Sequence, residues 1–214
     1  MSYQDKAAWI LGGGRFGQKA VIALSRLYSP DRILVVDPNP ETSTSDMVET
    51  LRADAVEFLA DNLEPGHAPI WVVPAVPFHL AYRWLLAKLE NVAIPYPVPS
   101  RYADGLPNPL SAPDGGYFAS YADFTCPDDC PEPADRCSYT GLPRKGNLFA
   151  TAAEIRLPGH TVLVLRSRQI APGLGGYFPA DLFQLEQRIR ETAGPILVVT
   201  ACRCHGVVHG LVIN

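Results

Sequence analysis

The sequence predicts an α/β protein with a mostly parallel sheet and a Cys- and Pro-rich lobe inserted into it. Three observations lead to this prediction. Short apolar runs alternate with segments of helical periodicity, and a glycine-rich turn follows the first apolar run. Ten of the 21 prolines lie between Pro95 and Pro143. We therefore expect a main domain made of residues 1–94 and 150–214, and an inserted lobe made of residues 95–149.

The first half of the chain alternates between apolar runs and amphipathic segments. The runs are rich in aliphatic residues, and the amphipathic segments repeat their apolar residues every three to four positions, as in a helix with one buried face. We expect strands over 7–11, 33–36 and 70–73, and helices over 16–27, 46–63 and 78–89.

The character of the sequence changes near Pro95. A segment so rich in proline cannot form regular helices or central strands. Its aromatic residues argue against disorder, so we expect an ordered excursion that a bound metal could stabilise. Beyond it, strands are expected over 161–165 and 196–200, with a helix over 181–191 between them.

Composition restricts the classes of protein. The chain has 214 residues and is 47% hydrophobic, which suits one large domain or one domain with a small lobe. Its net charge of −4 makes nucleic acid an unfavoured partner. No apolar run reaches the roughly 20 residues that span a bilayer, and the start of the sequence does not resemble a signal peptide. We expect a cytoplasmic protein without a membrane partner.

A dinucleotide fingerprint lies at the start of the chain. Gly12, Gly14 and Gly17 fit the pattern G-x-G-x-x-G between an expected strand and an expected helix, and Asp37 follows 20 residues after Gly17. In this pattern the first glycine permits a tight turn, the second lets the backbone approach a pyrophosphate, and the third allows close helix packing. Asp37 would accept hydrogen bonds from the adenosine ribose and repel a 2′-phosphate, which favours NAD over NADP.

The segment Trp9–Gly17, together with Val36 and Asp37, resembles the NAD-binding Rossmann domains of potassium-uptake regulators and many dehydrogenases. The resemblance covers roughly the first 40 residues. It implies a Rossmann-like fold and an NAD site at the glycine turn, to which Arg15 and Phe16 also belong.

The five cysteines form a second signal. Three lie in the proline-rich segment and two near the end of the chain: Cys126, Cys130, Cys137, Cys202 and Cys204. In a reducing compartment, clustered cysteines favour metal binding or redox chemistry over structural disulfides. We expect the three loop cysteines to converge with one of the C-terminal pair on a four-thiolate site.

The spacing leaves the kind of site open. Cys-x3-Cys fits neither the usual zinc knuckle nor a ferredoxin run, whereas the prolines directly after Cys126 and Cys130 resemble the Cys-Pro steps of iron–sulfur loops. We favour an iron–sulfur cluster. Zinc is the alternative, with His205 or His209 completing a Cys3His set, and a regulatory disulfide is a third reading.

Two weaker features follow the lobe. Arg166 and Arg168 leave an expected strand end, where α/β sheets bind ligands, so we expect them to bind an anionic substrate. The glycine-rich segment 172–177 is read either as a lid or second anion-binding turn or as a plain connector. If strand 196–200 is central in the sheet that carries the glycine turn, the Cys lobe lies over the cofactor cleft.

Together these features predict an NAD-linked redox protein with a thiolate-bound iron–sulfur cluster near the dinucleotide site. An NAD-dependent oxidoreductase is one form of this function, and the sequence leaves open whether the partner is a small molecule or another redox protein. The alternative is a non-catalytic NAD-binding, redox-sensing module with a structural zinc site. The sequence identifies no substrate.

Overall fold

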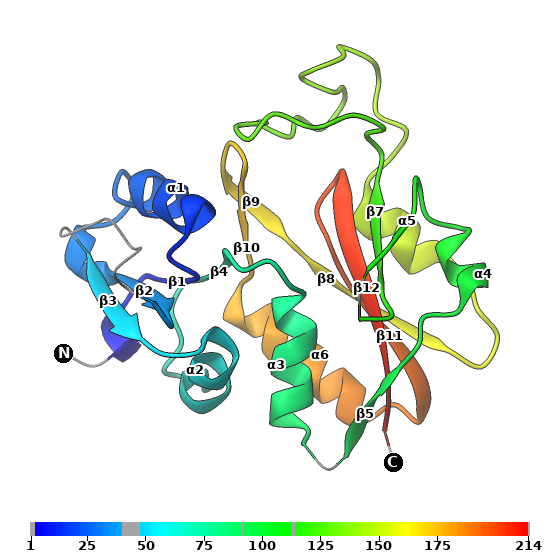
Figure 1. Cartoon of the computed structure of the whole chain (residues 1–214), viewed down its shortest axis with the longest axis horizontal. Coiled ribbons are helices and arrows are strands. Elements are labelled where there is room, and N and C mark those ends of the chain that lie inside the picture. Colours follow the sequence, from blue (N-terminus) through cyan, green and yellow to red (C-terminus); the bar gives the residue numbers. More distant parts are fainter. Residues whose placement is uncertain (1–2, 40–47, 91, 113, 214) are drawn as a thin grey trace. The chain divides into compact units, whose positions relative to one another are not determined.

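The computed structural model describes residues 3–39, 48–90, 92–112 and 114–213 (Figure 1). The protein is a mixed α/β protein whose chain forms two compact units. The first consists of Met1–Lys88 and Leu174–Phe183, and the second of Leu89–Gly173 and Gln184–Asn214. This division differs from the expected one, because the segment 95–149 shares its unit with strands that follow residue 150.

The first unit contains a four-stranded sheet in which every pairing is parallel. The strand order is β3-β2-β1-β4, with bounds Ala8–Leu11 (β1), Ile33–Asp37 (β2), Glu49–Arg52 (β3) and Trp71–Pro74 (β4). All four residues of β1 are fully buried, as expected for a central strand covered on both faces.

Helices pack on both faces of this sheet. On β1, Trp9 contacts the ring of Phe58 in α2, with 5.0 Å between ring centroids. The next residue, Ile10, points to the other face and lies against Gly17 of α1. The helices of this unit are α1 (Arg15–Leu24), α2 (Ala55–Asn62) and α3 (Leu80–Lys88), with 3-10 turns η1 (Tyr3–Asp5) and η2 (Pro30–Arg32).

One expected helix is partly wrong. The helix predicted over 46–63 begins only after Asp54, and its first two residues lie outside the described part of the chain. Glu49–Arg52 instead form strand β3. The cause is local, because the Asp54 carboxylate accepts hydrogen bonds from the amides of Val56 (2.8 Å) and Glu57 (3.1 Å) and so starts α2 there.

The second unit contains a mixed sheet. Its strand order is β6-β7-β12-β11-β8, and β5 pairs with the far end of β12. Among the described strands of this sheet, only the pair β8–β11 is parallel. The bounds are Ala93–Tyr96 (β5), Leu110–Ser111 (β6), Tyr117–Ser120 (β7), Thr161–Arg166 (β8), Gly194–Ala201 (β11) and His205–Ile213 (β12).

A compact apolar core lies between this sheet and helix α5 (Leu148–Glu154). Leu148 and Ala152 of the helix are buried against Leu197 and Val199 of β11. The remaining elements are α4 (Ser100–Ala103), β9 (Arg168–Ala171), β10 (Leu174–Gly176, in the first unit) and α6 (Pro179–Arg190, which begins in the first unit and ends in the second).

The strands expected over 7–11, 33–36, 70–73, 161–165 and 196–200 are confirmed as β1, β2, β4, β8 and β11. The expectation of one shared sheet is wrong. β11 is central, as predicted, but it pairs with β8 and β12, whereas β1 pairs with β2 and β4. The expectation that the Cys lobe lies over the cofactor cleft depended on one shared sheet, so it no longer has that support.

The last strand explains this difference. β12 was not predicted, because two histidines and two glycines interrupt its apolar pattern. It folds back on β11 as an antiparallel hairpin whose turn is Cys202–Cys204.

Among the residues that the structure describes, no helix has the length and apolar character needed to cross a membrane.

Candidate functional site

The glycine turn joins β1 to α1 in the first unit. Gly12 has a φ of +112°, a conformation that favours glycine, and its amide donates to the carbonyl of Val36 (2.8 Å). A Cβ atom at this position would lie 2.5 Å from the carbonyl oxygen of Ala75. Gly17 is equally constrained, because its Cβ would lie 2.0 Å from the carbonyl oxygen of Gly12. Both positions therefore require glycine for steric reasons.

Gly14 differs from these two glycines. It is the N-cap of α1 and has an ordinary φ of −67°. No atom lies within 4 Å of the position that its Cβ would occupy. The absence of a side chain here leaves open space in front of the first turn of the helix, and the N-terminus of a helix attracts anions.

Asp37 lies beside the same turn, at the end of β2. Its Oδ2 atom accepts a hydrogen bond from the amide of Gly13 (2.6 Å), and Oδ1 accepts one from the amide of Asn39 (2.7 Å). The turn and the carboxylate are thus held together.

Arg15 and Phe16 form the exposed beginning of α1. Phe16 is 49% exposed, and its ring contacts two cations, Arg15 (5.4 Å from Cζ to the centroid) and Lys19 (5.7 Å from Nζ). The first turns of the helix therefore present positive charge beside the glycine turn.

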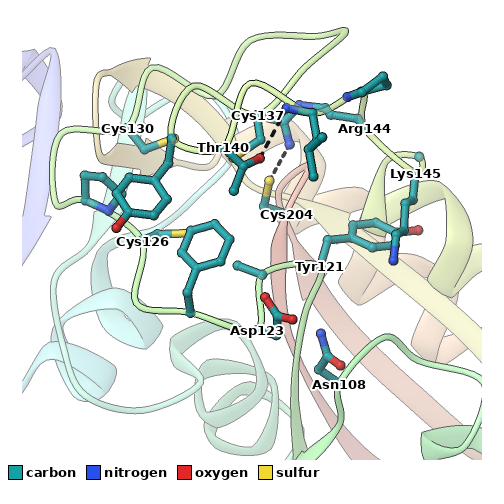
Figure 2. A pocket seen from close by; sticks show the side chains of 17 residues that line it. Asn108, Tyr121, Asp123, Cys126, Cys130, Cys137, Thr140, Arg144, Lys145 and Cys204 are labelled. Carbon is teal, nitrogen blue, oxygen red and sulfur yellow. Dashed lines mark hydrogen bonds between the residues drawn. The ribbon is translucent and has the colours of Figure 1, made fainter.

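Four of the five cysteines line one pocket in the second unit (Figure 2). The pocket has a volume of about 290 Å³, and its sulfur-bearing residues are Cys126, Cys130, Cys137 and Cys204. Three of these belong to the loop 121–147, and the fourth belongs to the turn between β11 and β12. We call it the thiolate pocket.

The loop 121–147 is unusual in its packing. It contains no helix and no strand beyond an isolated bridge between Arg136 and Pro143, and none of its side chains is buried. Its internal contacts include stacked rings of Phe124 and Tyr139, with centroids 4.8 Å apart. Such a loop lacks the apolar core that normally holds a chain in one conformation.

Cys137 occupies a tight turn that surrounds its sulfur with donors. The amide and hydroxyl of Thr140 and the amide of Tyr139 donate to the sulfur, and these hydrogen bonds lower the pKa of Cys137. The turn is closed by hydrogen bonds from Gly141 N to Cys137 O and from Cys137 N to Leu142 O, both 2.8 Å long. Amide donors around a sulfur stabilise the thiolate form.

The pocket cysteines interact electrostatically with one another. Burial raises the pKa of Cys126, and repulsion from the thiolates of Cys130, Cys204 and Cys137 raises it further. The sulfur of Cys130 also lies 3.3 Å from the hydroxyl of Ser138. The four sulfurs are therefore close enough for the charge on one to affect the others.

Arg144 is a pocket residue that the sequence analysis missed. Its Nη1 atom donates to the sulfur of Cys204, its Nε atom donates to the carbonyl of Pro133, and its amide donates to the carbonyl of Asp135 (2.9 Å). Burial raises the pKa of Cys204, and the guanidinium opposes that rise. The sequence feature that could have indicated it is the basic pair Arg144 and Lys145, which begins seven positions after Cys137.

The turn Cys202–Cys204 is clamped by its surroundings. The amide of Arg203 donates to the carboxylate of Glu132 (2.5 Å). All three carbonyls of the turn accept hydrogen bonds from the surrounding chain: Cys202 from Phe149 (3.2 Å), Arg203 from Leu148 (2.8 Å) and Cys204 from Tyr121 (2.9 Å).

Cys202 lies outside the set of residues that line the pocket. Its sulfur accepts hydrogen bonds from the amides of Cys204 (3.4 Å) and His205 (3.3 Å). Burial and the neighbouring Glu132 carboxylate raise the pKa of Cys202 to about 12. Cys204 is therefore the member of the pair that joins the loop cysteines.

The two histidines do not line the thiolate pocket either. His205 Nδ1 lies 3.9 Å from the sulfur of Cys202, and the buried His209 pairs with Asp114 (Nε2–Oδ1 2.7 Å). All five cysteines are free thiols. Among the described residues, no group of three or more His, Cys, Asp or Glu side chains is arranged to hold a metal ion.

The expected substrate arginines also lie in the second unit. Arg166 ends β8 opposite Ala201, the last residue of β11, and its guanidinium stacks on Phe149, 4.4 Å from the ring centroid. Arg168 begins β9. Arg166 thus belongs to the sheet of the Cys turn, whereas Arg168 begins a strand that lies outside both that sheet and the sheet of the glycine turn.

The glycine-rich segment contacts the cysteine loop. The carbonyl of Cys130 accepts hydrogen bonds from the amide of Gly173 (2.9 Å) and from the side chain of Gln169 (2.8 Å). Gly173 has a φ of +71°, and a Cβ atom there would lie 1.7 Å from the carbonyl oxygen of Asp128. Gly173 thus holds one side of the cysteine loop in place.

The structure thus defines an α/β protein with a glycine turn in one unit and a thiolate pocket in the other. The chain belongs to the family AF_1314_C, described as "Uncharacterized protein, C-terminal domain", whose model matches residues 81–214 and so includes all five cysteines. It is also similar to an "Uncharacterized protein" of Archaeoglobus fulgidus, with 30% identity over 94% of this chain and 97% of that protein. No solved structure matches the chain.

Proposed function

We propose that the protein is an NAD-linked redox protein that binds the dinucleotide at the glycine turn and an iron–sulfur cluster in the thiolate pocket. The observation that carries the proposal is the position of four cysteines. Three from the loop and one from the β11–β12 turn line the same pocket, although Cys204 follows Cys137 by 67 positions in the sequence.

Three features of the first unit support the dinucleotide part. The all-parallel order β3-β2-β1-β4 corresponds to the first four positions of the Rossmann order 3-2-1-4-5-6. The open space at Gly14 suits a pyrophosphate at the N-terminus of α1. The Asp37 carboxylate lies beside the glycine turn, where it would accept hydrogen bonds from the ribose hydroxyls. It would also repel a 2′-phosphate, which favours NAD over NADP.

Two features of the second unit support the cluster. The prolines directly after Cys126 and Cys130 resemble the Cys-Pro steps of iron–sulfur loops. Amide donors to a sulfur, as at Cys137, are also a usual way to tune a cluster. When bound, such a cluster supplies a one-electron donor and acceptor.

The protein's own residues have separate roles in this proposal. Cys126, Cys130, Cys137 and Cys204 would be the ligands, and the clamp on the Cys202–Cys204 turn would hold Cys204 in position. Arg166 and Arg168 remain candidates for binding an anionic substrate.

Because nicotinamide transfers a hydride and a cluster transfers single electrons, a flavin or redox-protein partner would connect the two steps. The free thiols suit a reducing, cytoplasmic location.

A second candidate is a non-catalytic NAD-binding sensor with a structural zinc site. It is favoured by the loop 121–147, which has no buried side chain and would gain its stability from a bound metal. The two candidates differ in the metal and in the response to NADH. Under anaerobic conditions, NADH with a flavin mediator should bleach a cluster, and it should leave a zinc protein unchanged.

The deciding experiment is metal analysis of protein purified without oxygen. The proposal predicts iron, acid-labile sulfide and broad visible absorbance. Cys204→Ser should lose most of the iron, because it removes a pocket ligand. Cys202→Ser is the matched control and should retain it, because Cys202 does not line the pocket. Protein that contains zinc and no iron would favour the second candidate, and equal losses in both variants would contradict the ligand set.

A further inference from the structure

We infer that Arg144 sets the reduction potential of the centre in the thiolate pocket, through its hydrogen bond to the sulfur of Cys204. The inference rests on the proposed iron–sulfur function and assigns to Arg144 the role of a tuning residue. The observation behind it is the contact between a guanidinium N–H and a pocket sulfur (Figure 2).

The geometry of Arg144 is fixed at three points. Its amide donates to the carbonyl of Asp135 (2.9 Å), and its Nε atom donates to the carbonyl of Pro133. The planar guanidinium therefore spans two acceptors, the carbonyl of Pro133 at Nε and the sulfur of Cys204 at Nη1.

Cys204 is equally well held. The amide of Tyr121 donates to its carbonyl (2.9 Å), and the neighbouring Arg203 is bound to Glu132 (2.5 Å). The donor and the acceptor are thus both positioned by bonds that do not involve a metal. This arrangement suits a hydrogen bond that persists when a group occupies the pocket.

Such a bond has a defined electrostatic effect. A cluster with four thiolate ligands becomes more negative when it accepts an electron, so a fixed positive charge and an N–H donor stabilise the reduced form more than the oxidised form. Arg144 should therefore raise the reduction potential. Arg144 is also partly shielded from solvent, which preserves more of this effect than full exposure would.

The adjacent Lys145 provides a matched control. It carries the same charge and lines the same pocket, but it is exposed, and its charge is screened by water. A comparison of Arg144→Gln with Lys145→Gln therefore separates the hydrogen-bonded cation from a general effect of positive charge near the pocket.

The experiment is an anaerobic redox titration of the wild type, Arg144→Gln, Arg144→Lys and Lys145→Gln, followed by electron paramagnetic resonance and visible absorbance, with iron measured in each. At a fixed potential, Arg144→Gln should lower the ratio of reduced to oxidised centre about tenfold, which is 59 mV for one electron. Arg144→Lys should lower it by a smaller factor, and Lys145→Gln should change it less than about twofold.

The outcomes separate this inference from the proposed function. A wild type without iron overturns both. If iron is present and the reduction potential is the same in wild type and Arg144→Gln, the inference alone is overturned. The same holds if Lys145→Gln shifts the potential as much as Arg144→Gln does. If Arg144→Gln does not retain iron, Arg144→Lys decides the question, because it keeps the charge but loses the planar fork, and an unchanged potential in it overturns the inference.

Discussion

The amide of Gly13 donates a 2.6 Å hydrogen bond to the carboxylate of Asp37, which lies at the end of the neighbouring strand. This bond joins the turn after β1 to the end of β2. It places a negative charge beside the turn at the N-terminus of α1, and the predictions for the first unit follow from it.

Gly14→Val should abolish dinucleotide binding without unfolding the protein. The added side chain would occupy the open space in front of α1, and its backbone conformation is ordinary. We expect a loss of at least tenfold in NAD affinity, about 1.4 kcal/mol, by calorimetry.

Gly17→Ala is the contrasting control. Its Cβ would meet the carbonyl oxygen of Gly12 at 2.0 Å, so it should destabilise the fold by about 1–3 kcal/mol in thermal or denaturant unfolding. A wild type without NAD affinity, or a Gly14→Val variant that binds as well as the wild type, would contradict the proposed site.

Asp37→Asn should reduce the preference for NAD over NADP. The substitution keeps the shape of the side chain and removes the charge that would repel a 2′-phosphate. We expect the ratio of the two affinities to fall about tenfold. Asp31→Asn removes the same charge from an exposed position of the first unit and should leave the ratio unchanged. An equal effect of both variants would show that overall charge, and not Asp37, sets the preference.

Gly173→Ala should loosen the cysteine loop. Gly173 and Gly159 have nearly the same left-handed φ, +71° and +75°, so alanine is strained at both positions. Only at Gly173 would the Cβ also meet the carbonyl oxygen of Asp128, at 1.7 Å, whereas the space around Gly159 is open.

We therefore expect faster proteolysis within 121–147 and a larger loss of bound metal in Gly173→Ala than in Gly159→Ala. Similar behaviour of the two variants would mean that backbone strain alone is responsible, and that Gly173 does not hold the loop.

Tyr102→Phe should lower stability and change its dependence on pH. Tyr102 is fully buried, and its hydroxyl donates to the carbonyl of Ala152 (2.9 Å), so the variant should lose about 1 kcal/mol at neutral pH. Burial raises the pKa of Tyr102 above its usual value of 10.0. Above pH 10 the unfolded state therefore loses the phenol proton first, and the free energy of unfolding falls as pH rises.

In Tyr102→Phe the free energy of unfolding should fall less steeply with rising pH, as measured by urea unfolding between about pH 8 and pH 11. Tyr139→Phe is the control, because that side chain is 63% exposed and its ring can still stack on Phe124. Identical pH profiles for wild type and Tyr102→Phe would show that the buried phenol makes no such contribution.

The sequence by itself determined the elements whose signals are local. The β-branched run before Asp37 predicts β2, and the glycine spacing predicts the turn between β1 and α1, because steric limits on a turn act over a few residues. The clustering of Cys126, Cys130 and Cys137 likewise predicts that they lie near one another.

Only the tertiary structure decided which strands share a sheet and which distant residues meet. β11 has the apolar pattern of a central strand, but nothing in that pattern specifies its neighbours, and β12 pairs with it despite Gly206 and Gly210. The choice of Cys204 over Cys202 depends on how the hairpin turn is held, and the contact of Arg144 with Cys204 spans 60 residues of sequence. Such contacts arise from long-range packing and hydrogen bonding, which leave no periodic trace in the sequence.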